Sequence, residues 1–467
     1  MAAKRKKLIV IGIDGGNFEV INSLISKGLM PNLTKLKFSG VLSSTIPPGT
    51  AVAWASFSTG NYPGKTGIYD FTLVNEDSWK INFINRKKLK GKTLWEMLSE
   101  NKIKSCFINI PLTYPPDKIN GVIISGIDTP STLNNYTYPP ELKEKLKEFD
   151  YEIEVGGLKE KSDMVKKCVE LVDKRTKVAN YLLEKDFDFF AILFRESDVA
   201  QHFAWGGEEV EEIYKKIDQF IGKVIEEEKN SDVIIISDHG EEEVKKAFNI
   251  NSWLEKEGYL KTTLKKKSLF SIFGINRERI YRILNYLNLD FLVKMVPRSF
   301  AKKIPTKDID FEEAILTKIV DLEKTRAIGK RAVKTAQIFL NTEERGGMVK
   351  KEEKDSLKKE IKEKLENFFA KNKIKALVQT KEELYGGAIN APDITLYLEE
   401  RGYDILTYFT GRDIWGIPRE EATHDTEGII FSNLSLQLKS ARIVDLAPTI
   451  LRYFGIKEKN FDGKSLL

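Results

Sequence analysis

The most constraining feature of the sequence is a series of short apolar runs, bounded by turn residues, that alternate with amphipathic helical patterns. The runs occupy residues 7–14, 105–110, 121–126, 189–194 and 232–239. Helical patterns such as "GKTLWEMLSEN" and "VKKCVELVDKRTKVANYLLEK" lie between them. Continuous apolar strands separated by helices are typical of a doubly wound, mostly parallel sheet that is covered on both faces. We therefore expect an α/β fold with helices flanking such a sheet.

Ionisable residues follow three of these predicted strands. Asp14 closes the first run, Asp238 and His239 close the fifth, and Asp198 comes four residues after the fourth. In open α/β sheets, chemistry gathers at the carboxyl ends of the strands. We expect these side chains to share one site.

The composition changes near residue 255. From Lys261 to Lys307 there are twelve Lys and Arg residues and two acids, and the block is helical in pattern. Predicted strands and one charged helix follow, at 336–341, 351–371, 375–379 and 393–398. We interpret residues 256–390 as an inserted basic helical and α+β cap, and residues 1–255 and 391–467 as one core.

Three interpretations of the basic block remain open. It forms a solvated face of the cap, an electrostatic collar that attracts anionic substrates, or a patch for peripheral contact with an anionic membrane through residues 261–307. The last rests on "LKKKSLFSIFGI", which mixes lysines with Leu, Phe and Ile.

Bulk properties exclude several classes of protein. The chain has 467 residues, no uninterrupted apolar run of transmembrane length and a net charge of +6, which is too mild to indicate a nucleic-acid partner. Cys106, in a predicted strand, and Cys168, in a predicted helix, form no CxxC motif, so we expect neither a disulfide framework nor a thiolate metal site. We expect a cytoplasmic protein, and its lysine- and glutamate-rich composition is typical of a thermophile. The oligomeric state is not predicted.

The chain has three histidines, and each lies near a carboxylate. "DVAQH" places Asp198 and His202 four residues apart, on one face of a helix, and "SDHG" ends a strand. "THDTEG" places His424 in a predicted turn before another apolar run. A single histidine is more often a core or surface group, but three in such settings favour a metal site of imidazoles and carboxylates, which suits zinc, manganese or iron.

The order of five motifs adds a resemblance. "IGIDGG", "TIPPGTAVAWASFSTGNYPGKTGIYDF", "DVAQH", "SDHG" and "THDTEGI" together resemble the type I phosphodiesterase/nucleotide pyrophosphatase family of the alkaline phosphatase superfamily. The resemblance covers most of the core and implies an alkaline-phosphatase-like fold. It also implies two divalent metal ions, with zinc as the first expectation and manganese or iron as alternatives. The implied ligands are Asp198, His202 and His424 for one ion, and Asp14, Asp238 and His239 for the other.

The resemblance assigns Thr50 as the nucleophile that bridges toward the second ion. A threonine hydroxyl is a poor nucleophile until a divalent cation stabilises its alkoxide. The preceding Pro-Pro-Gly turn would present Thr50, and the helix expected after it would direct N–H groups at a phosphoryl group. The alternative role for Thr50 is a helix N-cap alone.

The implied activity is that of a metal-dependent hydrolase that cleaves phosphodiester or pyrophosphate bonds in nucleotides or other small organic phosphodiesters through a phosphothreonine intermediate. A phosphomutase or phosphomonoesterase of the same superfamily is one alternative. A non-catalytic protein that binds anionic lipid through its basic cap is another. A sulfatase is disfavoured because that chemistry requires a modifiable Cys or Ser at the position of Thr50.

Some positions depart from the family pattern. Phe71 stands where nucleotide pyrophosphatases usually have an asparagine that donates to a phosphoryl oxygen, and Thr66 stands where histidine is frequent. Loss of the asparagine removes one oxyanion donor and could alter the substrate. Lys65 and Arg412 are candidates for a cationic clamp, but neither can be placed from the sequence.

Overall fold

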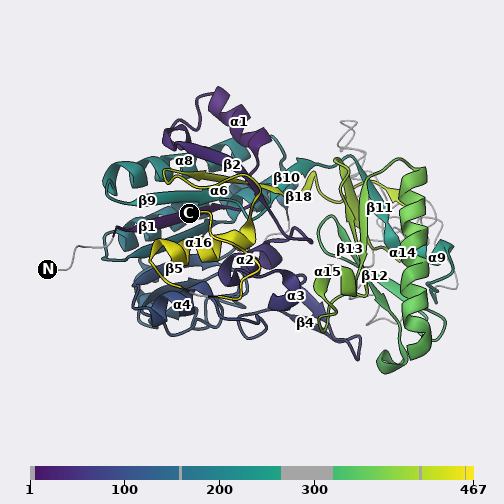
Figure 1. The fold of residues 1–467 in the computed structure, drawn as a ribbon. Helices are drawn as coiled ribbons and strands as arrows, with labels where there is room; N and C mark the ends of the chain where they lie inside the picture. Colours follow the sequence, from purple (N-terminus) through teal and green to yellow (C-terminus); the bar gives the residue numbers. More distant parts are fainter. Residues whose placement is uncertain (1–5, 157–159, 264–318, 410–412, 458) are drawn as a thin grey trace.

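In the computed structural model, the described residues (6–156, 160–263, 319–409, 413–457 and 459–467) form two bodies that lie side by side (Figure 1). The larger body surrounds a long central sheet, and the smaller surrounds a second sheet. No helix within these ranges is both long enough and apolar enough to cross a membrane.

Nine strands of the described chain form the central sheet. Five neighbouring strands, β9, β1, β8, β5 and β6, run parallel, which confirms the predicted mostly parallel α/β fold. β19 pairs antiparallel with β2 and β9, and β7 pairs antiparallel with β6. In spatial order the strands are β20 (Ala441–Arg442), β2 (Phe38–Ser43), β19 (Glu427–Ser432), β9 (Asp232–Ile236), β1 (Leu8–Ile13), β8 (Phe189–Phe194), β5 (Ser105–Ile110), β6 (Gly121–Ser125) and β7 (Thr137–Tyr138).

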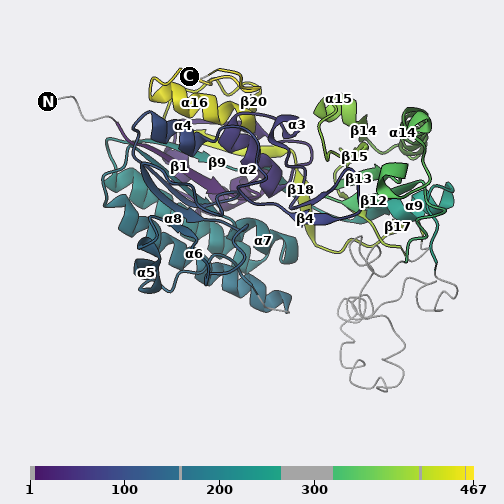
Figure 2. The ribbon, with the colours of Figure 1, turned by 90° about the horizontal axis from the view of Figure 1, so that it is seen from below.

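Helices cover both faces of this sheet, as Figure 2 shows. One face carries α2 (Thr50–Thr59), α4 (Leu94–Glu100) and α16 (Leu446–Tyr453). The other carries α1 (Phe18–Ser26), α5 (Leu142–Lys147), α6 (Lys161–Leu183), α7 (Glu196–Phe203) and α8 (Glu208–Glu227). Successive residues of β1 alternate between two hydrophobic clusters, Val10 in one and Ile9 in the other. A strand buried on both faces must be continuously apolar, which explains the runs seen in the sequence.

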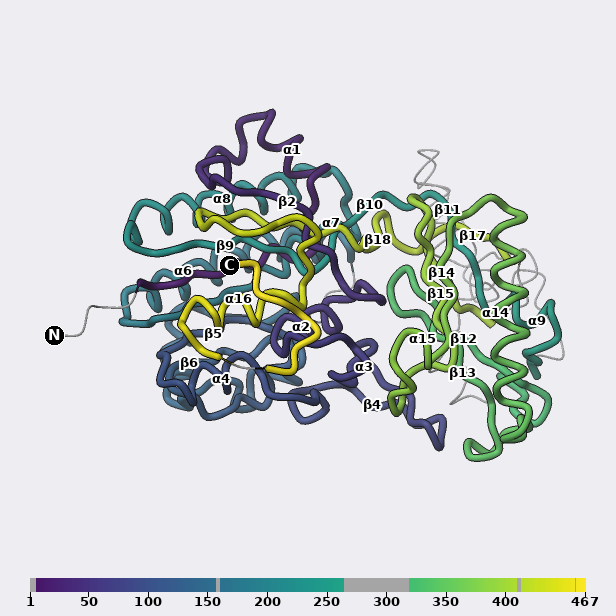
Figure 3. The backbone as a smooth tube through the Cα atoms, viewed as in Figure 1, coloured from purple at the N-terminus to yellow at the C-terminus, as the bar shows by residue number. Residues whose placement is uncertain are grey.

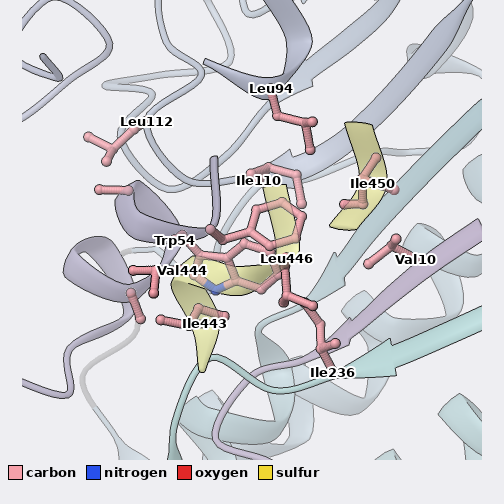
Figure 4. Packing of buried hydrophobic residues seen from close by; sticks show 14 of the residues in the cluster. Val10, Trp54, Leu94, Ile110, Leu112, Ile236, Ile443, Val444, Leu446 and Ile450 are labelled. Atoms are coloured by element: carbon pink, nitrogen blue, oxygen red, sulfur yellow. The ribbon is translucent and has the colours of Figure 1, made fainter. Parts of the chain in front are cut away.

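A close contact holds α2 against β1. The Trp54 side chain is fully buried among residues such as Val444 and Leu446 (Figure 4). A methyl group on Gly12 of β1 would lie 2.8 Å from Leu193 Cδ1 and 2.9 Å from Trp54 Cη2. The absence of a side chain at Gly12 therefore sets how closely the helix that begins at Thr50 approaches the strand that leads to Asp14.

The smaller body has its own hydrophobic cluster, which runs from Phe248 to Phe409 and also includes Val74. A four-stranded antiparallel sheet contributes β12 (Ala327–Arg331), β13 (Thr335–Leu340), β15 (Ile394–Leu398) and β14 (Ala376–Thr380). A three-stranded sheet contributes β16 (Tyr403–Leu406), β11 (Lys246–Asn249) and β17 (Trp415–Gly416). The described residues contribute the helices α9 (Ile250–Lys256), α14 (Lys354–Lys371) and α15 (Lys381–Tyr385) to this body. β11 and β16 belong to the smaller body but lie outside residues 256–390, the range predicted for the cap. The predicted boundaries of the cap, at residues 256 and 390, stay a prediction.

A strand ladder and a hairpin are among the connections that join the bodies. β10 (Gly240–Glu243) and β18 (Ala422–Asp425) pair antiparallel and lie between the two bodies in Figure 3. The hairpin of β3 (Thr72–Val74) and β4 (Ile81–Phe83) follows α3 (Pro63–Thr66), and within it the Trp79 indole N–H donates to Asn341 Oδ1 at 3.2 Å. The central sheet thereby meets the smaller body near the carboxyl ends of its parallel strands.

Most of the basic block lies outside the described residues, which omit 264–318. The three interpretations of residues 261–307, including membrane contact, therefore stay predictions. Cys106 and Cys168 are buried free thiols in β5 and α6, the predicted strand and helix.

We expect Gly12→Ala to destabilise the protein by about 1–3 kcal/mol, because the added methyl group would overlap the Trp54 and Leu193 side chains. Gly156→Ala is the matched control, since a methyl group there would meet no atom within 4 Å. Denaturant unfolding of both variants measures the difference. Equal stability of the two variants would contradict the packing constraint.

Candidate metal centre

Five elements, β1, α2, α7, β9 and β18, deliver the predicted site residues to one place. Asp14 follows β1, and its backbone N–H donates to Phe194 O at 3.0 Å. Asp238 and His239 follow β9, and α7, which begins just after β8, carries Asp198 and His202. These strands are adjacent and parallel, so their carboxyl ends meet at one edge of the sheet, as predicted from the sequence.

Thr50 is the first residue of α2, and Gly49 is the N-cap. Its hydroxyl therefore does not cap the helix and is free to face the site. Thr50 Oγ1 lies 3.3 Å from His239 Nε2 and 3.4 Å from Asp14 Oδ1.

His424 lies in strand β18, so the predicted turn at this position is wrong. Thr, Asp and Gly neighbours suggested the turn, but β10 supplies a pairing partner that is distant in the sequence. In this antiparallel ladder His424 stands directly opposite Glu241. The pairing carries the third histidine to the end of the parallel strands.

One group of possible ligands contains Asp198, His202, Glu241 and His424, each offering an atom within 4.8 Å of the others. Asp198 Oδ1 lies 3.3 Å from His202 Nε2 and 3.1 Å from His424 Nε2. The two Nε2 atoms are 3.0 Å apart. Glu241 Oε1 lies 3.7 Å from His202 Nε2.

A second group contains Asp14, Asp198 and His239. His239 Nε2 lies 3.3 Å from Asp14 Oδ1 and 3.2 Å from Asp238 Oδ2. Asp198 belongs to both groups, and the His239 and His424 rings stack with centroids 3.7 Å apart. The structure thus brings together all seven residues that the sequence placed at the site.

The orientation of the three imidazoles is fixed by the backbone. Each Nδ1 lies within hydrogen-bond distance of a carbonyl oxygen, which accepts a hydrogen only if Nδ1 carries it. The pairs are His202 with Ala422 O at 3.1 Å, His239 with Gly240 O at 3.1 Å and His424 with Pro48 O at 2.6 Å. In the neutral form, each imidazole held in this way presents the lone pair of its Nε2 to the site, the arrangement that metal-binding histidines adopt.

Several carboxylate oxygens at the site lack a hydrogen-bond partner among the described residues. Asp238 and Glu241 each have two buried oxygens without a hydrogen-bond partner among the described residues, and Asp14 has one. Buried carboxylates are costly unless they are paired or bind a metal. Lone pairs of imidazoles and carboxylates that face one another repel, and divalent cations between them would remove this repulsion. The residues present therefore fit divalent metal ions.

The pKa values of these groups reflect their burial and the crowding of carboxylates and imidazoles at the site. Burial and the nearby charge of Asp198 raise the pKa of Asp238 to about 7. Burial opposes the ionisation of His202, but Asp198 outweighs it and raises the pKa of His202 to about 9. Burial and the neighbouring His239 lower the pKa of His424 to about 3. The raised pKa of His202 indicates that the negative charge around it favours a positive charge at this position.

A buried ion pair supports the start of α7. The Arg175 guanidinium is 1% exposed, contacts Glu196 and donates to Tyr151 Oη at 2.7 Å. Arg195 pairs with Glu154 and lies 3.5 Å from Asp198 Oδ2. These contacts fix the helix turn that carries Asp198.

Glu241 and Glu420 are site residues that the sequence reasoning missed. The spacing of Glu241, two residues after His239 in a strand, was a usable signal, since alternate residues share a face. This signal was missed because a run of three glutamates usually indicates a solvated surface. Glu420 Oε2 lies 3.6 Å from His202 Nδ1 and 3.0 Å from Arg331 Nη2. Arg331 and His202 outweigh the effect of burial and lower the pKa of Glu420 to about 2.

A pocket of about 290 Å³ adjoins this arrangement between the two bodies. Lys330, Arg331 and Arg419 line it, and Asp70 is the one carboxylate that the described residues contribute to the lining. Lys330 pairs with Asp70, the residue before Phe71. One chain of contacts links this pocket to the site, because Arg331 in its lining pairs with Glu420, which lies beside His202.

Of the two candidates for a cationic clamp, Lys65 does not form one in the described structure, and Arg412 stays a prediction. Lys65 is exposed and pairs with Asp462, and Arg412 lies outside the described residues. The Phe71 ring packs against the core cluster, and its backbone N–H donates to Asp70 Oδ1 at 2.8 Å.

An α/β core with imidazoles, carboxylates and a helix-terminal hydroxyl at its strand ends is the architecture of an alkaline-phosphatase-like hydrolase. The sequence model for type I phosphodiesterase / nucleotide pyrophosphatase matches residues 8–429, nearly the whole chain. The chain belongs to this family, which confirms the resemblance drawn from its motifs, and it is an enzyme of the phosphodiesterase/pyrophosphatase hydrolase type.

Solved structures show the same fold. Phosphonoacetate hydrolase from Sinorhizobium meliloti, in complex with phosphonoformate, matches with a TM-score of 0.58 at 14% identity, covering 95% of each chain. Murine ectonucleotide pyrophosphatase/phosphodiesterase 5 matches with a TM-score of 0.54 at 12% identity, covering 98% of this chain and 97% of that one. No curated protein matches the chain.

In the metal-free protein, we expect the contributions of Asp238 and His202 to stability to fall as the pH rises, while His424, whose pKa is lowered to about 3, contributes the opposite change between about pH 3 and pH 6.5. Asp238 and His202 have folded-state pKa values of about 7 and about 9, above their ordinary values. Both therefore hold more protons in the folded state than in the unfolded state, so the free energy of unfolding falls between about pH 4 and pH 7 for Asp238 and between about pH 6.5 and pH 9 for His202. Thermal unfolding after chelation, at a series of pH values, measures this loss.

The variant Asp238→Asn isolates the contribution of Asp238 to this pH dependence, because the amide does not titrate. The difference in melting temperature between this variant and the unchanged protein should grow from pH 5 to pH 7, in favour of the variant. A difference that stays constant or reverses would contradict the raised pKa of Asp238.

Proposed function

We propose that the protein hydrolyses phosphodiester or pyrophosphate bonds in small organic substrates, with Thr50 as the nucleophile and two divalent cations as cofactors. The observation that carries the proposal is the position of the Thr50 hydroxyl, 3.3 Å from His239 Nε2 and 3.4 Å from Asp14 Oδ1, at the first residue of a buried helix. Asp14, Asp238 and His239 would hold one cation. Asp198, His202 and His424 would hold the other.

The start of α2 is suited to a phosphoryl group. The first N–H groups of an α-helix lack intrahelical acceptors. Gly49 offers no side chain to cap them, and the first turn of α2 contains no acidic residue. The N–H groups that follow Thr50 can therefore donate to phosphoryl oxygens, with the helix dipole favouring the negative charge.

Thr50 Oγ1 would attack phosphorus as the bond to the leaving oxygen breaks, giving a phosphothreonine. Divalent cations bound by these side chains would lower the pKa of the Thr50 hydroxyl and neutralise charge on the phosphoryl and leaving oxygens. The Thr50 proton is lost to solvent, and the leaving oxygen gains one. Water then cleaves the phosphothreonine, releasing the phosphoryl product and restoring the hydroxyl.

The cationic pocket supports a substrate whose leaving group carries its own negative charge. Lys330 and Arg331 have acidic partners, whereas Arg419 is exposed and has no ion pair within the described ranges. An anionic leaving group, such as a second phosphate or a carboxylate, would find its counter-charge at Arg419. Among the structural neighbours, the S. meliloti enzyme binds phosphonoacetate, and an inactive threonine-to-alanine variant of the murine enzyme binds AMP. Both ligands carry a phosphorus oxyanion on an organic group.

We expect Thr50→Ala to lower kcat by about 10³-fold or more, because the variant lacks the attacking oxygen. Thr50→Ser retains the hydroxyl and is the matched control. The measurement is turnover of p-nitrophenyl phosphate, its bis ester and nucleotide pyrophosphates in the presence of zinc, manganese or iron. Acid quench with a phosphorus-labelled diester should trap label on Thr50 in the unchanged enzyme and none in the alanine variant.

Unchanged turnover in Thr50→Ala would remove the nucleophile assignment. Higher activity on the monoester than on its bis ester would favour the phosphomonoesterase alternative. Absence of hydrolysis with every metal would argue against the enzyme's proposed substrates altogether.

We expect Arg419→Gln to raise KM about tenfold for substrates with an anionic leaving group, and to leave KM for a neutral leaving group nearly unchanged. The physical reason is loss of one charge-assisted contact to the leaving group. Steady-state kinetics on ADP-type pyrophosphates and on bis-p-nitrophenyl phosphate gives the comparison. Lys65→Gln, which removes a cation outside the pocket, is the control, and equal effects of both variants would contradict the role of Arg419.

A further inference from the structure

We propose that Glu241 is an additional carboxylate ligand of the cation held by Asp198, His202 and His424. This inference rests on the proposed function and deepens it, because it names a metal ligand outside the three that the family resemblance supplies. It also bears on which metal the protein selects.

The fold directs the Glu241 side chain into the site. Glu241 is directly opposite His424 in the antiparallel ladder of β10 and β18, and side chains at opposed positions lie on the same face. The neighbouring Glu242 points the other way and pairs with Lys334 at 2.7 Å. Glu241 therefore lies on the face of β10 that carries the imidazole of His424 on its partner strand.

In the described structure, the Glu241 carboxylate forms no ion pair with a lysine or an arginine, and Asp198 is an acidic neighbour. The residue is 1% exposed, and neither of its oxygens has a hydrogen-bond partner there. The closest nitrogen in an ion pair is His202 Nε2 at 3.7 Å, and the backbone contact of His202 Nδ1 turns that nitrogen toward the site. The nearby Gln201 Nε2 donates to Gly15 O at 3.2 Å, and among the described residues its second N–H forms no hydrogen bond with Glu241.

Gly15 leaves the space that Glu241 occupies. Its φ is +65°, and a methyl group there would lie 3.1 Å from Glu241 Oε1. A buried carboxylate held beside a second carboxylate, Asp198, is repelled unless a cation lies between them or a proton is shared. The four ligand atoms of this group lie within 4.8 Å of one another, so one cation placed between them can contact all four.

The added ligand changes the metal preference. Zinc usually takes four ligands, and a catalytic zinc keeps one position open for substrate or water. With Glu241, the protein itself would fill four positions, so a substrate oxygen requires a cation that accepts more than four ligands. Two carboxylates in the set also favour harder cations. We therefore infer that manganese or ferrous iron suits this position better than zinc.

Glu241→Gln tests the ligand. The amide retains size and hydrogen-bonding capacity but has no charge, so it would also preserve a role in which Glu241 is a neutral donor to Asp198. Glu243→Gln is the matched control, because Glu243 lies on the same strand, is exposed and pairs only with Lys245 among the described residues. Metal-depleted full-length proteins are titrated with Mn²⁺, and free Mn²⁺ is followed by electron paramagnetic resonance.

We expect two Mn²⁺ sites in the unchanged protein and in Glu243→Gln, and about a tenfold to hundredfold weaker affinity at one of them in Glu241→Gln. Zinc affinity, measured by competition, should fall less. Equal Mn²⁺ affinity in all three proteins would overturn the inference while leaving the proposed function intact. Absence of any Mn²⁺ or Zn²⁺ binding by the unchanged protein would instead overturn the proposed function.

A second measurement does not depend on the folding of a variant. Anomalous diffraction from crystals of the unchanged protein soaked in Mn²⁺ locates the ions. A Glu241 oxygen at about 2.2 Å from the ion near His202 supports the inference. An ion there with Glu241 beyond contact distance overturns it.

Discussion

The structure depends on how three backbone carbonyls orient three imidazoles. Each carbonyl engages Nδ1, and this leaves every Nε2 directed at a buried group of carboxylates. The carbonyls come from three separate segments of the chain, near Pro48, Gly240 and Ala422. Folding therefore assembles an excess of electron pairs in a space from which water is largely excluded. Such an assembly is costly alone and strongly favours divalent cations.

The smaller body contributes to this centre through the ladder of β10 and β18. The two strands present Glu241 and His424 on one side and connect into the second sheet on the other. On the opposite face of the ladder, the buried Lys334–Glu242 pair joins β10 to the turn before β13. The backbone and the Lys334–Glu242 ion pair thus join the smaller body to the strands that complete the metal centre. The position of the smaller body and the geometry of the site are therefore linked.

Much of this arrangement could be predicted from the sequence, and the reasons are specific. The proximity of Asp14, Asp238 and His239 could be predicted because residues at the ends of adjacent parallel strands must meet. Thr50 could be assigned only through the resemblance, since a threonine after a proline turn is equally a helix cap. The strand at His424 was missed because its partner, β10, lies about 180 positions earlier. Glu241 was missed because a run of glutamates resembles a solvated surface until the burial of alternate members is known.

The carbonyl of Pro48 has a consequence for how this site can change over time. One peptide unit accepts from the His424 imidazole and lies two residues before the Thr50 hydroxyl. A mutation that reshaped this turn would displace the attacking oxygen and a nitrogen donor together, rather than either by itself. Among relatives, we therefore expect few amino-acid differences in this turn and more at the rim of the pocket. Arg419 lies at that rim, where it can be exchanged without displacing the reacting atoms.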